Sequence, residues 1–260
     1  MSPIPLLLTL LCLGQAPVEK PNDEVSLKAM QQRVQAARVK LTDQANVKLQ
    51  LVTAPVFRYS DELRHIEDAG MWLWTDSGRP VAAMKVEHYQ PGIHPRPWLY
   101  CFTSLSSELV MAEWDGDPTF KARKPGVTWK PLDDTPATTR PARLIQMREI
   151  ARRFAAELQE PNANKDVHQM RLLSRPLYRY DDGLADVVDG AVFGFTGTGT
   201  NPDLLLLLDL TKAGGWRFGF AGMTAAGVTV RLKDDVIWQV ADANGKGFVF
   251  DNWTYFSPAK

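Results

Sequence analysis

Pro55-Val-Phe-Arg-Tyr-Ser-Asp61 and Pro176-Leu-Tyr-Arg-Tyr-Asp-Asp182 are two versions of one pattern, with four identical positions and two conservative replacements. Ordered recurrence of blocks at a long period is typical of an internal duplication. We therefore expect two tandem, equivalent units, over residues 22–135 and 138–258. Three further blocks recur in the same order: Trp74–Gly78 with Phe195–Gly199, Trp98–Phe102 with Trp216–Phe220, and Val127–Trp129 with Val236–Trp238.

A helix is predicted at the start of each unit. Apolar residues at spacings of three and four form one helix face in each case. Asn22 suits the cap of the first helix, within residues 23–50, and Pro141 suits the first turn of the second, which Pro161 ends. The two stripes are Leu27, Met30, Val34, Ala37 and Leu41, and Leu144, Met147, Ala151, Phe154 and Leu158.

Short antiparallel strands are predicted for most of the remaining sequence. Met71–Trp74 with Val81–Val86, and Trp98–Phe102 with Leu109–Trp114, read as hairpins. The run Leu204–Leu208 does not alternate with polar residues, so both faces of its strand should be buried. We therefore expect an α+β fold of two tandem units, each a helix packed on an antiparallel β-sheet.

The first sixteen residues have the composition of a signal peptide. They contain an apolar core from Ile4 to Leu13 and small residues, Gly14 and Ala16, near the expected cleavage point. This run is too short to span a bilayer, so no transmembrane span is expected in the mature chain. Cleavage would also leave Cys101 as the only cysteine, so no internal disulfide is expected. These features favour export to the periplasm or the cell exterior of a bacterium.

Composition and motifs exclude several function classes. Thirty basic residues balance thirty acidic ones, so no nucleic-acid partner is expected. Thr196–Pro202 has glycines like a phosphate loop but precedes a strand-like run, and Asp242–Gly247 lacks the spacing of a calcium loop. The four histidines show no metal-ligand spacing. We therefore predict no catalytic residues, no metal and no cofactor from sequence, and interpret Cys101 as a small buried apolar residue.

The recurring Arg-Tyr pair supplies weak candidates for a binding site: Arg58, Tyr59, Arg179 and Tyr180. Two arginines in equivalent positions suit bidentate recognition of a carboxylate or phosphate. The alternative is that each arginine lies over its sheet and pairs locally, preserving the same corner in both units. The local pairing is favoured.

Several runs resemble uncharacterised exported proteins of planctomycete-type bacteria. This resemblance implies export and a bacterial source, and it implies no activity. The runs are Gly70–Pro80, Arg148–Ala155, Arg175–Tyr180 and Asp189–Phe195.

Three function hypotheses remain open. The leading one is a non-enzymatic exported protein that acts by binding or by interaction with the cell envelope. It is favoured because the sequence contains no local catalytic motif and has 25 aromatic residues. The second is a carrier of a lipid or other apolar ligand in a cavity between sheet and helices, lined by Trp72, Trp74, Trp98 or Trp216. The third is a hydrolase whose residues meet only in space, using His88 or His94 with a carboxylate.

Overall fold

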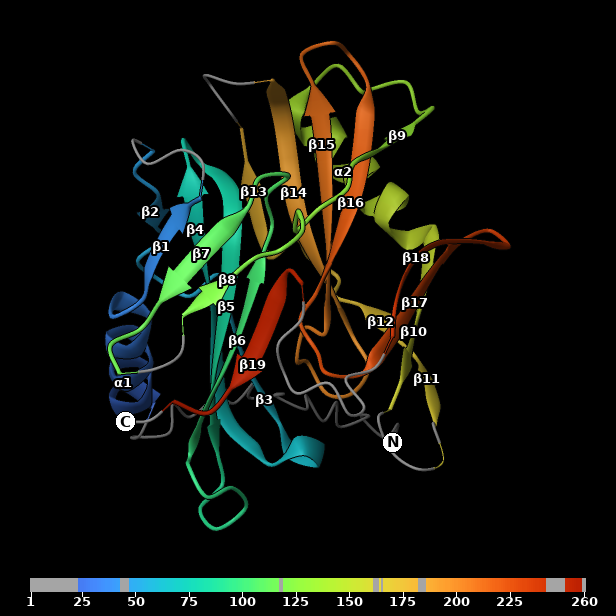
Figure 1. Cartoon of the computed structure of the whole chain (residues 1–260). Coiled ribbons are helices and arrows are strands. Elements are labelled where there is room, and N and C mark those ends of the chain that lie inside the picture. The colour runs from blue at the N-terminus through green and yellow to red at the C-terminus, as the bar shows by residue number, and fades with distance from the viewer. Residues whose placement is uncertain are drawn as a thin grey trace, which may run out of the picture.

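Antiparallel sheets dominate the computed structural model, which describes residues 23–42, 47–116, 119–160, 164, 166–181, 186–241 and 251–258. The fold is 49% strand and 13% helical, and its described residues contain two α-helices, α1 (Asp23–Gln35) and α2 (Arg140–Arg152). The predicted α+β class is therefore wrong, and the protein has a β-rich fold (Figure 1). The predicted signal peptide, residues 1–16, and the Asp242–Gly247 turn lie outside the described residues.

The first half of the chain contributes one large and one small sheet. The large sheet has the order β19-β6-β5-β4-β2, with β3 also paired to β4, and the small sheet has the order β1-β7-β8. We call the former the first large sheet. Its strands are β19 (Trp253–Phe256), β6 (Trp98–Ser104), β5 (Arg79–Tyr89), β4 (Ile66–Asp76), β2 (Gln50–Leu51) and β3 (Phe57–Asp61). A 3-10 turn, η1 (Glu62–Arg64), follows β3, and the small sheet contains β1 (Arg38–Leu41), β7 (Val110–Glu113) and β8 (Phe120–Lys121).

The second half repeats this arrangement. The second large sheet has the order β9-β16-β15-β14-β12, with β13 also paired to β14, and its small sheet has the order β11-β10-β17-β18. The large sheet contains β9 (Lys130–Leu132), β16 (Trp216–Gly222), β15 (Leu204–Thr211), β14 (Val187–Thr196), β12 (Arg171–Leu172) and β13 (Tyr178–Tyr180). The small sheet contains β11 (Val167–Gln169), β10 (Phe154–Gln159), β17 (Gly227–Leu232) and β18 (Asp235–Val240).

The two halves exchange their last strands. β9 precedes α2 in the chain but pairs with β16 in the second large sheet, and β19 ends the second half but pairs with β6 in the first large sheet. The two large sheets therefore have the same strand order, and in each sheet one edge strand comes from the other half of the chain. Because of this exchange, the predicted units 22–135 and 138–258 each contain one strand that belongs to the large sheet of the other unit.

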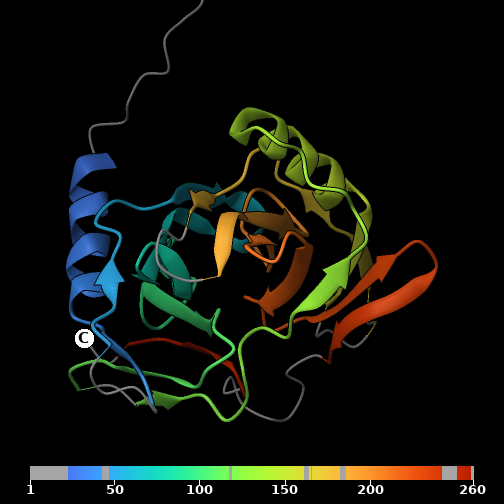
Figure 2. The same cartoon turned by 90° about the horizontal axis from the view of Figure 1, so that it is seen from above.

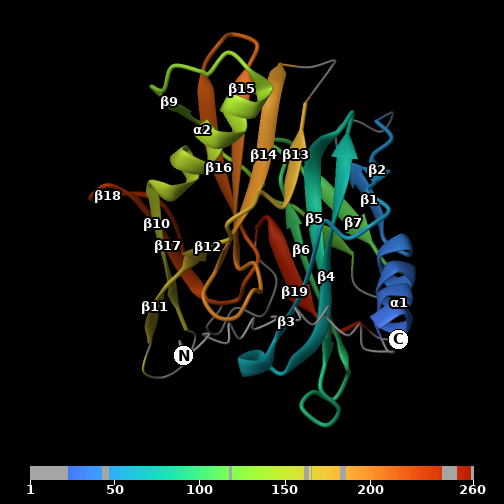
Figure 3. The ribbon, with the colours of Figure 1, turned by 180° about the vertical axis from the view of Figure 1, so that it is seen from behind.

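The two large sheets pack against each other, and a helix covers the outer side of each. One apolar cluster joins residues of β4, β5 and β6 to residues of β14, β15 and β16. A second cluster joins α1 and β1–β7–β8 to the outer face of the first large sheet, and a third joins α2 and its small sheet to the second. Figure 2 shows α1 and α2 on separate outer sides of the strands, and Figure 3 shows the same layers from behind.

Both predicted helices are too long, because helix and strand periodicity coincide in their second halves. α1 ends at Gln35 and α2 at Arg152, and the following residues form β1 and β10. Ala37 and Leu41 are four residues apart, a separation that shares a face on a helix and also on a strand. Phe154 and Leu158 are spaced alike. Pro141 does lie in the first turn of α2, where the Thr139 side chain accepts a hydrogen bond from the Ala142 amide.

Other strand predictions divide into confirmed and wrong ones. The hairpin of β4 and β5 is confirmed, and so is burial of both faces of Leu204–Leu208, whose alternate leucines belong to different clusters. The hairpin of Trp98–Phe102 with Leu109–Trp114 is wrong, because β6 pairs with β5 and β19 while β7 pairs with β1 and β8. The match of Val127–Trp129 with Val236–Trp238 is also wrong, because Val236–Trp238 lies in β18, whereas Val127–Trp129 leads into the exchanged strand β9.

Candidate functional site

A carboxylate with several donors lies between the large sheets, and we call it the first polar centre. Glu87 on β5 is fully buried. Its Oε1 accepts hydrogen bonds from Tyr59 Oη (2.7 Å) and Asn201 Nδ2 (3.2 Å), and its Oε2 accepts from Tyr255 Oη (2.7 Å) and Tyr89 Oη (3.2 Å). The exchanged strand β19 supplies Tyr255, and the β14–β15 loop supplies Asn201. The centre therefore requires both halves of the chain.

Lys85 completes this centre. Its Nζ lies 3.4 Å from Glu87 Oε1 and donates to Asn201 Oδ1, Pro202 O and Met223 O at 2.8, 3.1 and 2.8 Å. The side chain is 1% exposed, so these contacts replace its water. A buried ion pair is tolerated when further hydrogen bonds satisfy both partners, as they do here.

The net effect of these contacts is to stabilise the charged form of Glu87. Burial acts to raise its pKa, but the Lys85 ammonium and hydrogen bonds from Tyr255 and Tyr59 outweigh it, so the pKa of Glu87 is lowered. Burial, together with the nearby Glu87 charge, raises the pKa of Tyr59 and Tyr255 well above 10. The tyrosines therefore remain neutral donors and the glutamate an acceptor.

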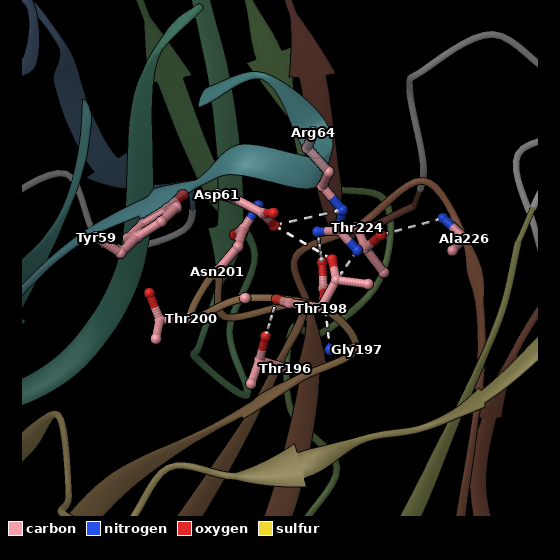
Figure 4. Close-up of polar contacts among 12 residues, drawn as sticks. Tyr59, Asp61, Arg64, Thr196, Gly197, Thr198, Thr200, Asn201, Thr224 and Ala226 are labelled. Carbon is pink, nitrogen blue, oxygen red and sulfur yellow. Dashed lines mark hydrogen bonds and ion pairs between the residues drawn. The ribbon is translucent and has the colours of Figure 1, made fainter. Parts of the chain in front are cut away.

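A guanidinium lies at the end of the sandwich beside this centre (Figure 4). Arg64, on η1, donates to both oxygens of Asp203 at 2.7 and 3.2 Å, and its Nε lies 3.7 Å from Asp61 Oδ2. Thr198 Oγ1 donates to the same Asp61 oxygen, and the Gly197 amide donates to Asp203. Thr196–Pro202, which its sequence context had set apart from phosphate loops, is thus a hairpin turn between β14 and β15, and these contacts fix it to β3 and η1.

The second polar centre lies on the other large sheet. Asp209 on β15 is fully buried, and it accepts hydrogen bonds from Tyr180 Oη, Arg79 and Arg217. Asp186 also pairs with both guanidiniums, at 3.4 Å from Arg79 and 3.0 Å from Arg217. Burial and the Asp209 charge raise the pKa of Tyr180 well above 10.

The two centres are equivalent in strand register. Tyr59 lies opposite Ala69, which lies opposite Glu87, whereas Tyr180 lies opposite Gly190, which lies opposite Asp209. The contacts between halves are also reciprocal. Arg79, where the β4–β5 hairpin returns, reaches Asp209 in the second sheet, and Asn201, in the matching β14–β15 loop, reaches Glu87 in the first.

The four sequence candidates divide between these two centres and do not share one ligand site. Arg58 donates to both oxygens of Asp68 at 3.0 and 2.7 Å, and Arg179 donates to both oxygens of Asp189 at 2.9 and 2.7 Å. Tyr59 and Tyr180 are buried donors to Glu87 and Asp209. This geometry matches the local-pairing alternative, in which the same corner occurs twice.

Substituting the arginines should therefore cost stability and leave ligand binding unchanged. We expect Arg58→Ala and Arg179→Ala each to lower the free energy of unfolding by about 1–2 kcal/mol, because each removes the bidentate partner of a carboxylate. Asp68 is partly buried, whereas Asp189 is fully buried and keeps Arg143 as a partner at 2.8 Å. Urea unfolding of the purified variants measures this. A variant as stable as the wild type would contradict the structural role, and Arg152→Ala, at an exposed pair with Glu149, serves as the control.

Sequence reasoning missed most of these polar residues. Lys85 and Glu87 alternate with apolar residues along β5, which reads as a strand with one solvent-exposed face. Their burial depends on the second large sheet, which no local pattern reveals. One sequence pattern could have pointed to Tyr255, because Trp253-Thr-Tyr255 resembles Val127-Thr-Trp129. The first of these segments lies in the exchanged strand β19, and the second directly precedes the exchanged strand β9.

An open pocket lies in the first half, between β1 and the segment leading into β2. Its volume is about 430 Å³, within the range of small-ligand sites. The apolar part of the lining comes from the end of α1 and from β1, β2 and β4, together with the residues next to them. The rest of the lining consists of polar and charged side chains. The lining consists of Ala37, Val39, Leu49, Leu51 and Trp74, with Gln35, Arg38, Lys40 and Glu113.

The corresponding region of the second half is filled. Counting from the ends of α1 and α2, Ala37 corresponds to Phe154, which packs against Phe218 and Phe220 at centroid distances of 5.0 and 5.3 Å. Trp74 and Leu49 correspond to Phe195 and Met170, both in the buried cluster beneath α2. The same framework therefore has a closed core in one half and a pocket in the other.

Pairing of β11 with β10 closes the second half, and no described residue pairs with that edge of β1. Glu157 lies opposite Gln169 in the closed ladder, and the Gln169 amide donates to its carboxylate at 2.7 Å. By register, Lys40 and Lys48 take the positions of these two residues in the first half. Like charges directly opposite each other would disfavour such a strand pair in the first half.

His88 and Cys101 are the other side chains that the sequence analysis considered for chemistry. His88 Nδ1 lies 3.4 Å from Glu67 Oε2 on the surface, and among the described residues no hydroxyl or thiol hydrogen-bonds to His88. Cys101 is fully buried, as predicted, and burial raises its pKa to about 12. Within the described ranges, no group of three or more histidine, cysteine or carboxylate side chains is placed to hold a metal ion. None of the described helices is long and apolar enough to span a bilayer.

Comparison of the chain with protein-family models, curated proteins and solved structures finds no match.

Proposed function

We propose that the protein is a non-enzymatic binding protein, exported to the periplasm or cell exterior of a bacterium, which takes a small ligand with an apolar body in the pocket of its first half. The observation that carries the proposal is the asymmetry between the halves. Among the described residues, one framework occurs twice, and the region that Phe154, Met170 and Phe195 fill in the second copy is an open pocket in the first.

The buried polar centres support this reading over the hydrolase hypothesis. Glu87 and Asp209 are both fully buried, and their donors come from both sheets. Because neither carboxylate is exposed at the surface, these charges fasten the sheets together and offer no route to a substrate. A general acid or base has to reach the proton that it moves.

The apolar walls support the carrier form of the binding hypothesis. Trp74 is 4% exposed and contributes to the lining, so a ligand in the pocket would change the surroundings of its indole ring. A titration of the purified protein with decanol, followed by tryptophan fluorescence and by native mass spectrometry, tests this. One bound decanol per chain is the expected result, and no change up to the solubility limit would contradict the proposal.

Ala37→Phe should close the pocket. The variant places at this position the side chain that fills the equivalent space in the second half, so we expect decanol affinity to fall about tenfold or more while the chain remains folded. Isothermal titration calorimetry measures the affinity, and circular dichroism the fold. Val25→Phe is the matched control, because Val25 is 70% exposed on α1 and does not line the pocket. Unchanged affinity in Ala37→Phe would show that decanol binds elsewhere.

A further inference from the structure

We propose that the side chains of Lys85 and Asn201 react with each other to form an intramolecular isopeptide bond, with Glu87 transferring the protons and ammonia being released. The bond would join β5 of the first large sheet to the β14–β15 loop of the second half. The observation that carries the proposal is the contact of an amine, a carboxamide and a carboxylate in a buried site. This modification is independent of the pocket and of any ligand.

The three reacting groups already contact one another in pairs. Lys85 Nζ lies 2.8 Å from Asn201 Oδ1 and 3.4 Å from Glu87 Oε1. The same Glu87 oxygen accepts a hydrogen bond from Asn201 Nδ2 at 3.2 Å. A nucleophile that is held beside its carbonyl group has the rate advantage of an intramolecular reaction. The lysine amine is a nucleophile once it has lost a proton, and Glu87 is within reach to accept that proton.

The remaining contacts of the amine direct it toward the carboxamide. Lys85 Nζ also donates hydrogen bonds to Pro202 O and Met223 O, at 3.1 and 2.8 Å. A neutral amine has two N–H donors and one lone pair, so these two backbone carbonyls can accept both donors. The lone pair then faces the side on which Asn201 and Glu87 lie.

Burial of the site favours this reaction over its competitors. The side chains of Lys85, Glu87 and Asn201 are all buried, so bulk water is kept away from the carboxamide. Transfer of a proton from the ammonium to the carboxylate turns an ion pair into a neutral pair, which removes the cost of keeping two charges out of water. Asn201 precedes Pro202, which has no backbone N–H, so ring closure onto the following nitrogen is blocked as a route of ammonia loss.

The reaction balances within these three groups. Glu87 takes a proton from the Lys85 ammonium, and the lone pair of Nζ attacks Cγ of Asn201 to form the new C–N bond. The bond between Cγ and Nδ2 of Asn201 then breaks. Of the three protons on the ammonium, one remains on the new amide nitrogen, and Glu87 passes the other two to the leaving nitrogen, which departs as an ammonium ion. Glu87 ends as a carboxylate, and no oxidant or further reactant is consumed.

The second polar centre lacks the reacting pair. By strand register, Leu207 takes the position of Lys85, and Asp209 takes that of Glu87. The nitrogen donors to Asp209 are two guanidiniums, which stay protonated in proteins and have no lone pair to offer. We therefore expect one isopeptide bond in the chain, at the first polar centre.

Intact-mass spectrometry of the purified full chain tests the proposal. After incubation at neutral pH until the spectrum stops changing, we expect the wild type to weigh one ammonia less than its sequence requires. Tryptic mapping should then show a branched peptide that joins Lys85 to Asn201. A wild type that stays at full mass would overturn the proposal, and so would an ammonia loss that maps to any other residue.

Two variants and a control separate the parts of the reaction. Glu87→Gln keeps the size of the side chain but cannot accept the proton of the ammonium, so we expect it to stay at full mass. Asn201→Ala removes the carboxamide and should also stay at full mass. Lys212→Gln, at an exposed lysine directly after β15, is the matched control and should lose ammonia like the wild type. Loss of ammonia from Asn201→Ala would overturn the bond, and loss from Glu87→Gln would overturn the role of Glu87.

The bond should also raise the resistance of the chain to unfolding. Lys85 and Asn201 are 116 positions apart in the sequence, and a cross-link of this span restricts the unfolded chain in the way that a disulfide does. The reacted chain should therefore unfold at a higher temperature than the unreacted chain, and the intact mass shows which of the two an unfolding experiment measures. Equal unfolding temperatures for the two forms would contradict a bond between the two halves.

Discussion

Glu87→Ala is expected to lower the free energy of unfolding by about 4 kcal/mol, which is the largest effect that we anticipate from a single substitution. The change leaves the Lys85 ammonium buried without its counter-ion, and it removes the carboxylate that accepts hydrogen bonds from Tyr59 and Tyr255. Removing one partner of a buried ion pair costs more than the pair itself contributes, because the remaining charge stays out of water. Chemical unfolding followed by tryptophan fluorescence measures the loss.

Glu87→Gln separates the charge from the hydrogen bonds, because the amide keeps an acceptor for one tyrosine. We expect it to lose less than the alanine variant. The pH dependence gives a second check. The pKa of Glu87 is lowered in the folded state, so its stabilising contribution is present above the unfolded-state value of about 4.3 and is lost as the pH falls through the folded pKa. The stability difference between wild type and Glu87→Gln should therefore narrow below about pH 4.5, and a constant difference would contradict this assignment.

Asp209→Ala is expected to cost about 3 kcal/mol, because it leaves Arg79 and Arg217 without their buried carboxylate and Tyr180 without an acceptor. The two arginine side chains are 25% and 20% exposed and both also contact Asp186, so water and this second carboxylate compensate in part. We therefore expect a smaller loss than for Glu87→Ala, measured by the same unfolding experiment. An equal or larger loss would show that Asp186 contributes little.

A double-mutant cycle shows how far Asp209 couples the two halves. Arg79 belongs to the first half and Asp209 to the second, so a coupling free energy of about 1–2 kcal/mol between Arg79→Ala and Asp209→Ala would measure their contact directly. Arg217 lies on the same sheet as Asp209 and supplies the control cycle within one half. Additive effects for Arg79 and Asp209 would contradict the contact across the sheets.

Local sequence patterns predicted those parts of the structure in which the contacting residues are close together in the chain. The β4–β5 and β14–β15 hairpins could be predicted, because short turns join strands that pair with each other. The ends of the helices could not, since Ala37 and Leu41 fit the period of a helix and also that of a strand. That ambiguity produced two long helices and the wrong α+β class.

The candidate site could be predicted only in outline. Of the four tryptophans expected as possible cavity-lining residues, Trp74 lines the pocket and Trp72, Trp98 and Trp216 do not. The rest of the lining combines β1, β2 and β7, whose neighbours depend on sheet order. Lys40 gave no signal from sequence, because charged residues that alternate with apolar ones are normal on an exposed strand face.

The sequence by itself determined the repeated Arg-Tyr corner, the two helix starts and the fully buried Leu204–Leu208 strand, because each depends on residues close together in the chain. Only the tertiary structure decided that β9 and β19 change places and that Asn201 and Arg79 reach Glu87 and Asp209. These contacts join residues more than 100 positions apart, and they form because two buried carboxylates must find donors once the large sheets exclude water. No local pattern encodes which distant side chains will supply those donors.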